Sequence, residues 1–305
     1  MGLLFMRLPH AIQRCVRGIF WALLAIIAAQ FASQANCESE LWRIGVDGTE
    51  CRRFAETPRY RCGSPDWSPD GQWVAYDTWP FGGSAQDSQV AVIRADGTGG
   101  RLLGPGGMPS WSPDGKRLVC HTYDQRGGIV VMNADGTGRE TILDHWGSPR
   151  WSPRGNRIAS ISSGTIALFD CATGTERAIF RGPYSLRQGF GISPDGLRFC
   201  FPDANGGVGL ATLDEKTLRA SVRWLVKTEQ CYHASWAPDG RRVVMALAPT
   251  NQDKDQLYIM DVDSDKTPTW LPGQDRTRTN TNPDWSPDGK TIIFCCQVST
   301  QAQGE

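Results

Sequence analysis

The sequence predicts an all-β fold, a six-bladed β-propeller with four strands in each blade. The first observation is an internal repeat, because a Trp-Ser-Pro-Asp-Gly motif or a close variant occurs six times. The second is the spacing, since successive motifs begin 44, 40, 41, 44 and 49 residues apart, the length of one propeller blade. The third is that the two ends of the repeat region complement each other. The six motifs begin at Trp67, Trp111, Trp151, Ile192, Trp236 and Trp285.

Each motif predicts the turn of a β-hairpin. In Ser-Pro-Asp-Gly the proline presets φ at the second turn position and the glycine supplies the left-handed residue. The aspartate accepts local backbone N–H bonds, so it stabilises the turn without a ligand. Short runs of strand-forming residues follow the turns, for example residues 73–76 and 291–294. The tryptophan that precedes each turn is expected to fill the wedge between neighbouring blades.

A second hairpin lies between successive motifs. Residues 90–98 and 129–137 each place Ala-Asp-Gly-Thr after a mainly apolar run, and Asp-Gly is a strong hairpin signal. Each repeat therefore holds two hairpins, hence four strands. The region opens with a hairpin of this second kind, residues 41–54, and closes with one of the first kind, residues 283–296. We expect these two halves to form one composite blade that closes the ring and leaves no edge strand at a seam.

The first 35 residues differ from the repeat region. Three arginines precede an apolar run over residues 18–29, and Ser33 and Ala35 stand at the usual cleavage positions. A basic start, a short apolar middle and a small-residue exit predict a secretory signal peptide. The alternative is an uncleaved membrane anchor, for which the run is short, since a spanning helix needs about 20 apolar residues. We therefore expect a signal over residues 1–35, the propeller over 40–297 and a polar tail over 298–305.

Composition narrows the classes of partner. Lysine plus arginine equals aspartate plus glutamate at 32 each, so the basic excess of a nucleic-acid-binding protein is missing. Apart from Cys295 and Cys296 the cysteines are spread singly, with no Cys-x-x-Cys pair. We expect most of them to be reduced core thiols, with a Cys51–Cys62 disulfide as the alternative in an oxidising compartment. The sequence predicts a monomer with no nucleic-acid partner, and membrane contact only through an uncleaved N-terminal segment.

The sequence contains no catalytic constellation that we recognise. The nearest string to a Gly-x-Ser-x-Gly nucleophile elbow, residues 191–195, has aspartate where the second glycine is required. His121, His145 and His233 fall in different repeats, so they could bind a metal together only if all three pointed into the channel. We therefore expect no cofactor and no metal, and a binding protein rather than an enzyme. The alternative is a small propeller enzyme of the polysaccharide lyase or lactonase type, with a metal site in the central channel.

The central channel is the candidate site, because the innermost strand of each blade lines it. The residues one and three positions before each motif are mostly small and polar, as a hydrated funnel requires. Polar residues that merely solvate a narrow bore are the alternative interpretation. Among them we select four ligand contacts at one channel mouth, namely Asp66, Arg150, His233 and Asp284.

The repeat also resembles that of a known family. The pattern Pro-x-Trp-Ser-Pro-Asp-Gly-x-x-Ile/Val, alternating with an Asp-Gly-Thr hairpin, is similar to the propeller repeat of TolB, the periplasmic component of the Tol–Pal system, over about residues 40–297. The resemblance implies a periplasmic or secreted scaffold of the cell envelope that binds a protein or peptide partner at the mouth of its channel. TolB also carries an α/β domain before its propeller, for which we expect no room between residue 36 and the first hairpin. Similar repeats form the propeller of prolyl-oligopeptidase-type peptidases, whose hydrolase domain we do not expect here.

Overall fold

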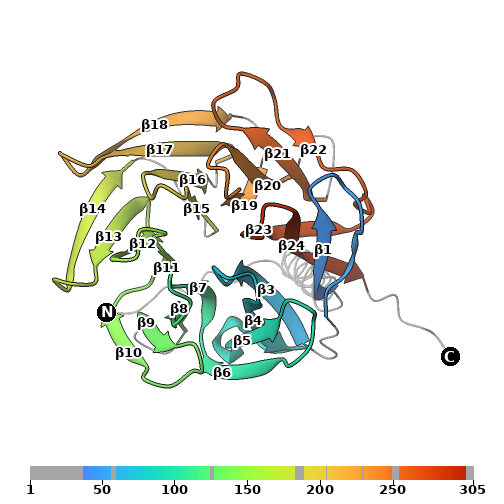
Figure 1. The fold of residues 1–305 in the computed structure, drawn as a ribbon, viewed down its shortest axis with the longest axis horizontal. Helices are drawn as coiled ribbons and strands as arrows, with labels where there is room; N and C mark the ends of the chain where they lie inside the picture. The colour runs from blue at the N-terminus through green and yellow to red at the C-terminus, as the bar shows by residue number, and fades with distance from the viewer. Residues whose placement is uncertain are drawn as a thin grey trace, which may run out of the picture. The chain divides into compact units, whose positions relative to one another are not determined.

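The structure is a computed structural model that describes residues 37–55, 60–123, 127–182, 189–203, 205–227, 230–248 and 254–299. These residues form six antiparallel sheets of four strands, arranged as blades around a central axis (Figure 1). The predicted six-bladed, all-β propeller is confirmed. Its compact unit spans Glu38–Val298. The predicted signal, and most of the predicted tail, lie outside the described residues. In the part of the chain that is described, no helix is long and apolar enough to cross a membrane.

Blades 1 to 3 each run from an innermost strand outwards in chain order. Blade 1 consists of β3 (Tyr60–Trp67), β4 (Trp73–Pro80), β5 (Gln89–Arg94) and β6 (Arg101–Pro105), with a short 3-10 helix, η1 (Ala85–Asp87), before β5. Blade 2 consists of β7 (Gly107–Trp111), β8 (Arg117–Thr122), β9 (Gly128–Asn133) and β10 (Glu140–Leu143). Blade 3 consists of β11 (Ser148–Trp151), β12 (Arg157–Ser162), β13 (Thr165–Asp170) and β14 (Thr175–Arg181).

Blades 4 and 5 follow the same plan, whereas blade 6 does not. Blade 4 consists of β15 (Gly191–Ile192), β16 (Arg198–Pro202), β17 (Val208–Asp214) and β18 (Arg219–Val226). Blade 5 consists of β19 (Gln230–Trp236), β20 (Arg242–Ala248), β21 (Gln256–Asp261) and β22 (Thr269–Trp270). Blade 6 consists of β23 (Thr279–Trp285), β24 (Thr291–Ser299), β1 (Cys37–Gly45) and β2 (Arg52–Arg53).

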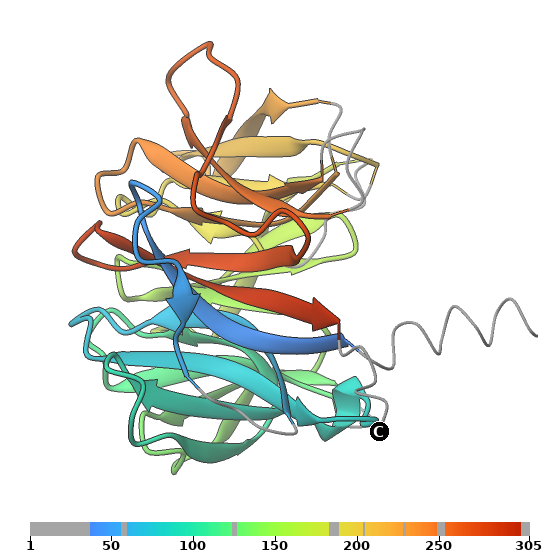
Figure 2. The same ribbon diagram turned by 90° about the vertical axis from the view of Figure 1, so that its right-hand side faces the viewer.

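Blade 6 is built from both ends of the repeat region. Its strand order is β2-β1-β24-β23, so the first described strand pairs with the last one. Figures 1 and 2 show the blue β1 beside the red β24. The expected composite blade is therefore confirmed, and the ring closes by main-chain hydrogen bonds rather than at an open seam.

The Ser-Pro-Asp-Gly turns hold themselves together. In the first repeat the Ser68 hydroxyl donates to Oδ1 of Asp70 at 2.6 Å, and the same oxygen accepts the N–H of Gln72 at 3.0 Å. These bonds, led by that from Ser68, lower the pKa of Asp70. Gly71 takes φ 69°, the left-handed region that favours glycine. In the turns that begin at Ser112, Ser193 and Ser286, the serine hydroxyl likewise donates to the aspartate of its own turn.

The repeat tryptophans occupy the wedges between blades, as expected. Trp236 of blade 5 is 6% exposed and packs in one cluster with Val208 and Leu210 of blade 4. Arginines of the preceding blade cover the rings of Trp151, Trp236 and Trp285, and the Arg198 guanidinium lies 4.7 Å from the centre of the Trp236 ring. Such a cation–π contact adds about 0.5 to 2 kcal/mol to the apolar packing, the larger values where the pair is shielded from water. The wedge is thus the hydrophobic core of each blade junction.

Most of the described cysteines are buried in the hydrophobic cores of these blade junctions. Cys51 packs against the cluster between blades 5 and 6, whereas Cys62 belongs to the cluster between blades 6 and 1. The two thiols are not bonded to each other in this structure. Burial raises the pKa of the Cys120 thiol to about 11, which makes that thiol a weak nucleophile at neutral pH.

Candidate functional site

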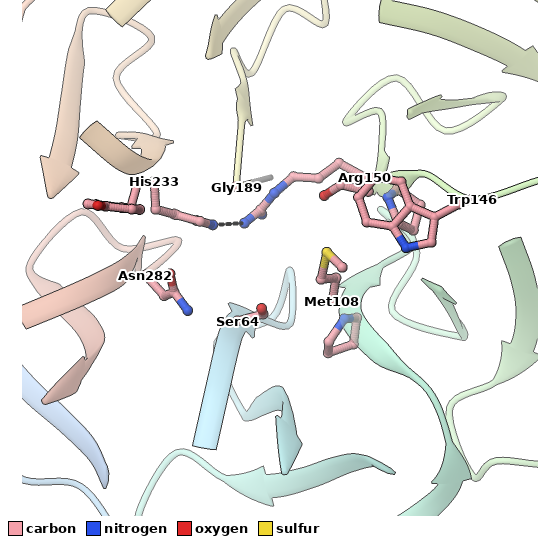
Figure 3. Close-up of a pocket in the computed structure, with 11 residues that line it drawn as sticks. Ser64, Met108, Trp146, Arg150, Gly189, His233 and Asn282 are labelled. Atoms are coloured by element: carbon pink, nitrogen blue, oxygen red, sulfur yellow. Dashed lines mark hydrogen bonds between the residues drawn. The ribbon is translucent and has the colours of Figure 1, made fainter. Parts of the chain in front are cut away.

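The channel holds two cavities, one toward each end of the innermost strands. The first, of about 400 Å³, is lined by residues in the first part or middle of these strands and in the connections before them (Figure 3). The second, of about 410 Å³, is lined by residues at the ends of the same strands and by the prolines of the Ser-Pro-Asp-Gly turns. Arg150 of β11 lines both cavities. Its side chain therefore divides the channel.

A polar cluster centres on Arg150. Its Nη1 donates to Oδ1 of Asp66 at 2.7 Å and lies 3.8 Å from Oδ1 of Asp284. Its Nη2 lies 3.3 Å from Nε2 of His233 (Figure 3). A guanidinium only donates, so Nε2 is the acceptor and the neutral imidazole carries its proton on Nδ1. The structure thus brings together, from four different blades, all four residues that the sequence analysis selected.

Burial sets the charge of this cluster. Burial lowers the pKa of His233 well below its usual range, and the positive charge of Arg150 lowers it further. Burial raises the pKa of Asp66 to about 7, although the Arg150 guanidinium opposes the rise. The pKa of Asp284 is also raised, by burial. One guanidinium therefore faces a neutral imidazole, the Asp66 carboxyl, which takes up a proton near neutral pH, and the Asp284 carboxyl, whose pKa is also raised.

The four residues do not all face one mouth. His233 lines the first cavity, Asp66 and Asp284 line the second, and Arg150 lines both. The difference follows from position, because His233 stands three residues before its motif and the aspartates stand one residue before theirs. These positions lie at different depths along the innermost strands. Contact of the four side chains with a ligand stays a prediction.

The residue just before each motif also ties adjacent blades together. In four repeats this side chain accepts the backbone N–H of the motif tryptophan of the next blade around the ring. The spacing of the motifs does not predict these bonds. The one sequence feature that accompanies them is an aspartate or serine directly before the motif tryptophan. The donor–acceptor pairs are Trp111 N with Asp66 (2.7 Å), Trp151 N with Ser110 (3.2 Å), Trp285 N with Ser235 (3.4 Å) and Trp67 N with Asp284 (2.9 Å).

Two repeats lack an acceptor at this position, because it is occupied by Arg150 and Gly191. A Cβ on Gly191 would lie 2.8 Å from the Ala234 carbonyl oxygen and 3.0 Å from the Trp236 ring, so blades 4 and 5 approach too closely there for a side chain. Arginine has no acceptor to offer. Its side chain instead crosses the channel to the carboxyls of the other blades.

The rim of the first cavity is built from strained backbone. Ser64, Met108 and Asn282 have φ of 44°, 52° and 50°, and each stands at a β-bulge that interrupts its innermost strand. Non-glycine residues in this region cost on the order of 1 kcal/mol or more each and gather at functional sites. A proline follows each of the three residues. The bulges direct the three side chains toward the cavity, as Figure 3 shows.

An aromatic wall completes the first cavity. Trp146, in the connection before β11, is 39% exposed and lines the cavity together with Tyr232. Beneath it lies the buried ring of His121, whose centre is 5.2 Å from that of Trp146 and 4.8 Å from that of Tyr123. Trp146 and Tyr232 were not predicted from the sequence, because neither stands at a repeated position.

The three histidines do not converge. His121 supports Trp146, His233 contacts Arg150, and Nε2 of His145 lies 3.0 Å from Glu176. Within the described ranges, no group of three or more His, Cys, Asp or Glu side chains is placed to hold a metal ion.

The raised pKa of Asp66 makes stability depend on pH. Its pKa is about 7 in the folded protein against an ordinary value of 3.8, so the folded state binds the proton more tightly than the unfolded state. The resulting contribution to the free energy of unfolding is complete below about pH 4 and is lost as the pH rises through about 7. We expect the melting temperature of the wild type, relative to that of Asp66→Asn, to fall steadily between about pH 5 and pH 8.

Asp70→Asn is the matched control for this measurement. The pKa of Asp70 is lowered rather than raised, so its contribution is lost only at acidic pH. Its difference from the wild type should be level over the same range. A level difference for Asp66→Asn as well would contradict the expectation.

No protein family model matches the chain. An uncharacterised protein of Agrobacterium fabrum is 28% identical over 164 residues, which cover 51% of this chain and 52% of the relative. YuxL, an uncharacterised peptidase of Bacillus subtilis, is 35% identical over 63 residues, or 19% of this chain and 9% of the peptidase. The chain thus spans about half the length of the first relative and less than a tenth of the second.

Solved structures give a broader match. A putative TolB from Agrobacterium tumefaciens has a TM-score of 0.68 at 17% identity, covering 86% of this chain and 99% of that one. TolB from Acinetobacter baumannii has a TM-score of 0.60 at 18% identity, covering 88% and 65%. An oligogalacturonate lyase in complex with manganese has a TM-score of 0.53 at 14% identity, covering 82% and 80%. Structural similarity at identities this low establishes the fold alone. In its fold the chain is a TolB-like six-bladed β-propeller.

Proposed function

We propose that this chain is an exported TolB-like propeller that binds a segment of a protein or peptide partner in the first cavity, as a scaffold of the cell envelope. The basic and apolar pattern of residues 1–35 supports export. The similarity of its fold to two TolB structures supports a binding role. The enzyme alternative gains no specific support from the described residues.

The first cavity is the favoured binding site because its rim has strained backbone, its Trp146 ring is partly exposed and polar side chains line it. Three bulged residues at its rim hold costly backbone conformations, which persist only where the surroundings impose them. Trp146 offers an exposed aromatic surface, a residue type enriched among the strongest contacts of interfaces. The second cavity is bordered instead by turns whose aspartates are bonded within the turn. A partner segment therefore finds its anchoring surface in the first cavity.

The proposal is tested by affinity purification from envelope extract with the tagged wild type and two variants. Trp146→Ala removes the aromatic wall and is expected to reduce recovery of the specific partner about tenfold or more. Leu102→Ala, which truncates a residue 55% exposed on the outermost strand β6, is the matched control and should recover the partner as the wild type does. Equal recovery by the wild type and Trp146→Ala would place the partner elsewhere and sink the proposal.

A further inference from the structure

The two cavities differ in charge. Among the described residues that line the first cavity, Arg150 bears the one full charge, because burial and Arg150 itself keep His233 neutral. The carboxyls that face Arg150, those of Asp66 and Asp284, line the second cavity. Arg150 thus meets its negative partners on one side of the channel. On the other side it borders a space that contains no negative side chain among those lining it.

The other polar groups around the first cavity suit an anion. The hydroxyl of Ser148 and the amide of Asn282 can each donate a hydrogen bond, whereas the Ser64 hydroxyl is bonded to the buried Asp77 carboxyl. A guanidinium presents five N–H groups in a planar fork, and the contacts described above engage Nη1 and Nη2 toward neighbouring side chains. The guanidinium therefore retains donors beyond its present contacts.

We propose that the partner segment in the first cavity presents a carboxylate to Arg150 and packs an apolar side chain against Trp146. The carboxylate belongs to an Asp or Glu side chain or to the C-terminus of the segment, since all three offer the same planar pair of acceptors. Trp146 and Arg150 line the same cavity of about 400 Å³, which has room for a few side chains of a peptide. This inference rests on the proposed function and names the chemistry that the site recognises.

Charge balance gives the inference a distinctive signature. A bound carboxylate brings a third negative group to a cluster that already holds two carboxyls and one guanidinium. The groups that face Arg150 are Asp66 of β3, Asp284 of β23 and His233 of β19. Asp66 takes up a proton near neutral pH, so its protonation frees Arg150 for the incoming carboxylate. Binding is therefore accompanied by proton uptake, and the affinity rises as the pH falls from about 8 to about 6.

The experiment uses random octapeptides displayed with free C-termini and selected on the immobilised protein. Each enriched peptide is synthesised in its acidic form and as an isosteric amide, with Gln for Glu, Asn for Asp or a C-terminal amide. Calorimetry is expected to show the acid binding about 10- to 100-fold more tightly than the amide at pH 6, and less so at pH 8. Asp66→Asn should remove the pH dependence. Arg150→Lys retains the positive charge but loses the planar fork, and should weaken the acid about tenfold.

The outcomes separate the inference from the proposed function. Peptides that lose binding in Trp146→Ala but tolerate the amide would overturn the carboxylate and leave the peptide-binding function standing. Enriched peptides that bind Trp146→Ala as well as they bind the wild type would overturn both. Oligogalacturonate serves as a probe that carries carboxylates on a saccharide. Its binding, with no peptide enriched, would assign the cavity to a sugar acid and overturn the peptide partner.

Discussion

Replacing Arg150 with methionine is expected to lower the free energy of unfolding by about 3 to 5 kcal/mol, because it leaves buried carboxyls without their counter-charge. The side chains of Asp66 and Asp284 are only 10% and 9% exposed. Each also accepts a backbone N–H from the next blade, so neither can turn away toward solvent without breaking a blade junction. Chemical denaturation at about pH 8, where the carboxyls are most ionised, measures the full effect.

The matched control is Arg154, which lies in the Ser-Pro-Arg-Gly turn that follows β11 in the same blade. Arg154 is 46% exposed and its partner Glu215 is 50% exposed, so Arg154→Met should change stability by less than about 1 kcal/mol. Combining Arg150→Met with Asp66→Asn and Asp284→Asn removes the uncompensated charge and should restore part of the loss. A triple variant no more stable than Arg150→Met would show that the arginine stabilises the ring by packing and not by charge.

Truncating Trp285 to alanine is expected to cost about 3 to 5 kcal/mol, the usual range for emptying a large aromatic site in a core. Trp285 is 4% exposed and packs with Val244 and Leu257 of blade 5 and with Phe294 of blade 6. Its ring also lies 5.1 Å below the Arg242 guanidinium. The loss falls on the junction between blade 5 and the composite blade. Thermal unfolding should therefore show a melting temperature lower by roughly 10 °C.

Two further variants distinguish the filling of the wedge by Trp285 from the loss of an aromatic ring elsewhere in the protein. Trp285→Ile copies the residue that blade 4 uses at this position, Ile192, and should lose less than the alanine variant because it refills part of the wedge. Trp146→Ala removes a ring that is 39% exposed and should lower the melting temperature less than Trp285→Ala does. Equal losses for Trp285→Ala and Trp146→Ala would contradict the wedge role.

The fold was predictable because its information is local and repeated. Asp70 and Gly71 specify a turn through contacts within a few residues, and the same chemistry recurs at blade-length spacing. Six copies of a weak signal make a strong one. The composite blade followed from which hairpin stands at each end of the region.

The site was predictable only in part, because its geometry depends on contacts between distant residues. The bond from Trp67 N–H to Asp284 joins residues 217 positions apart, and no local pattern encodes it. Polarity one and three residues before the motifs pointed to Arg150 and His233, which line the first cavity, while their contact with a ligand stays a prediction. The depth of each side chain, and the wall provided by Trp146, depend on bulges and connections that differ between blades.

The composite blade also sets the order in which the molecule can be assembled. Blades 1 to 5 each use consecutive strands and can form as soon as their own segment is available. β1 precedes blades 1 to 5 in the chain but finds its partner, β24, only after the segments of those five blades have been made. Until then β1 presents an unpaired edge, the kind of surface that promotes association between incomplete chains. Bringing such distant segments together is also slow relative to local pairing. Ring closure is therefore the late, committing event of folding.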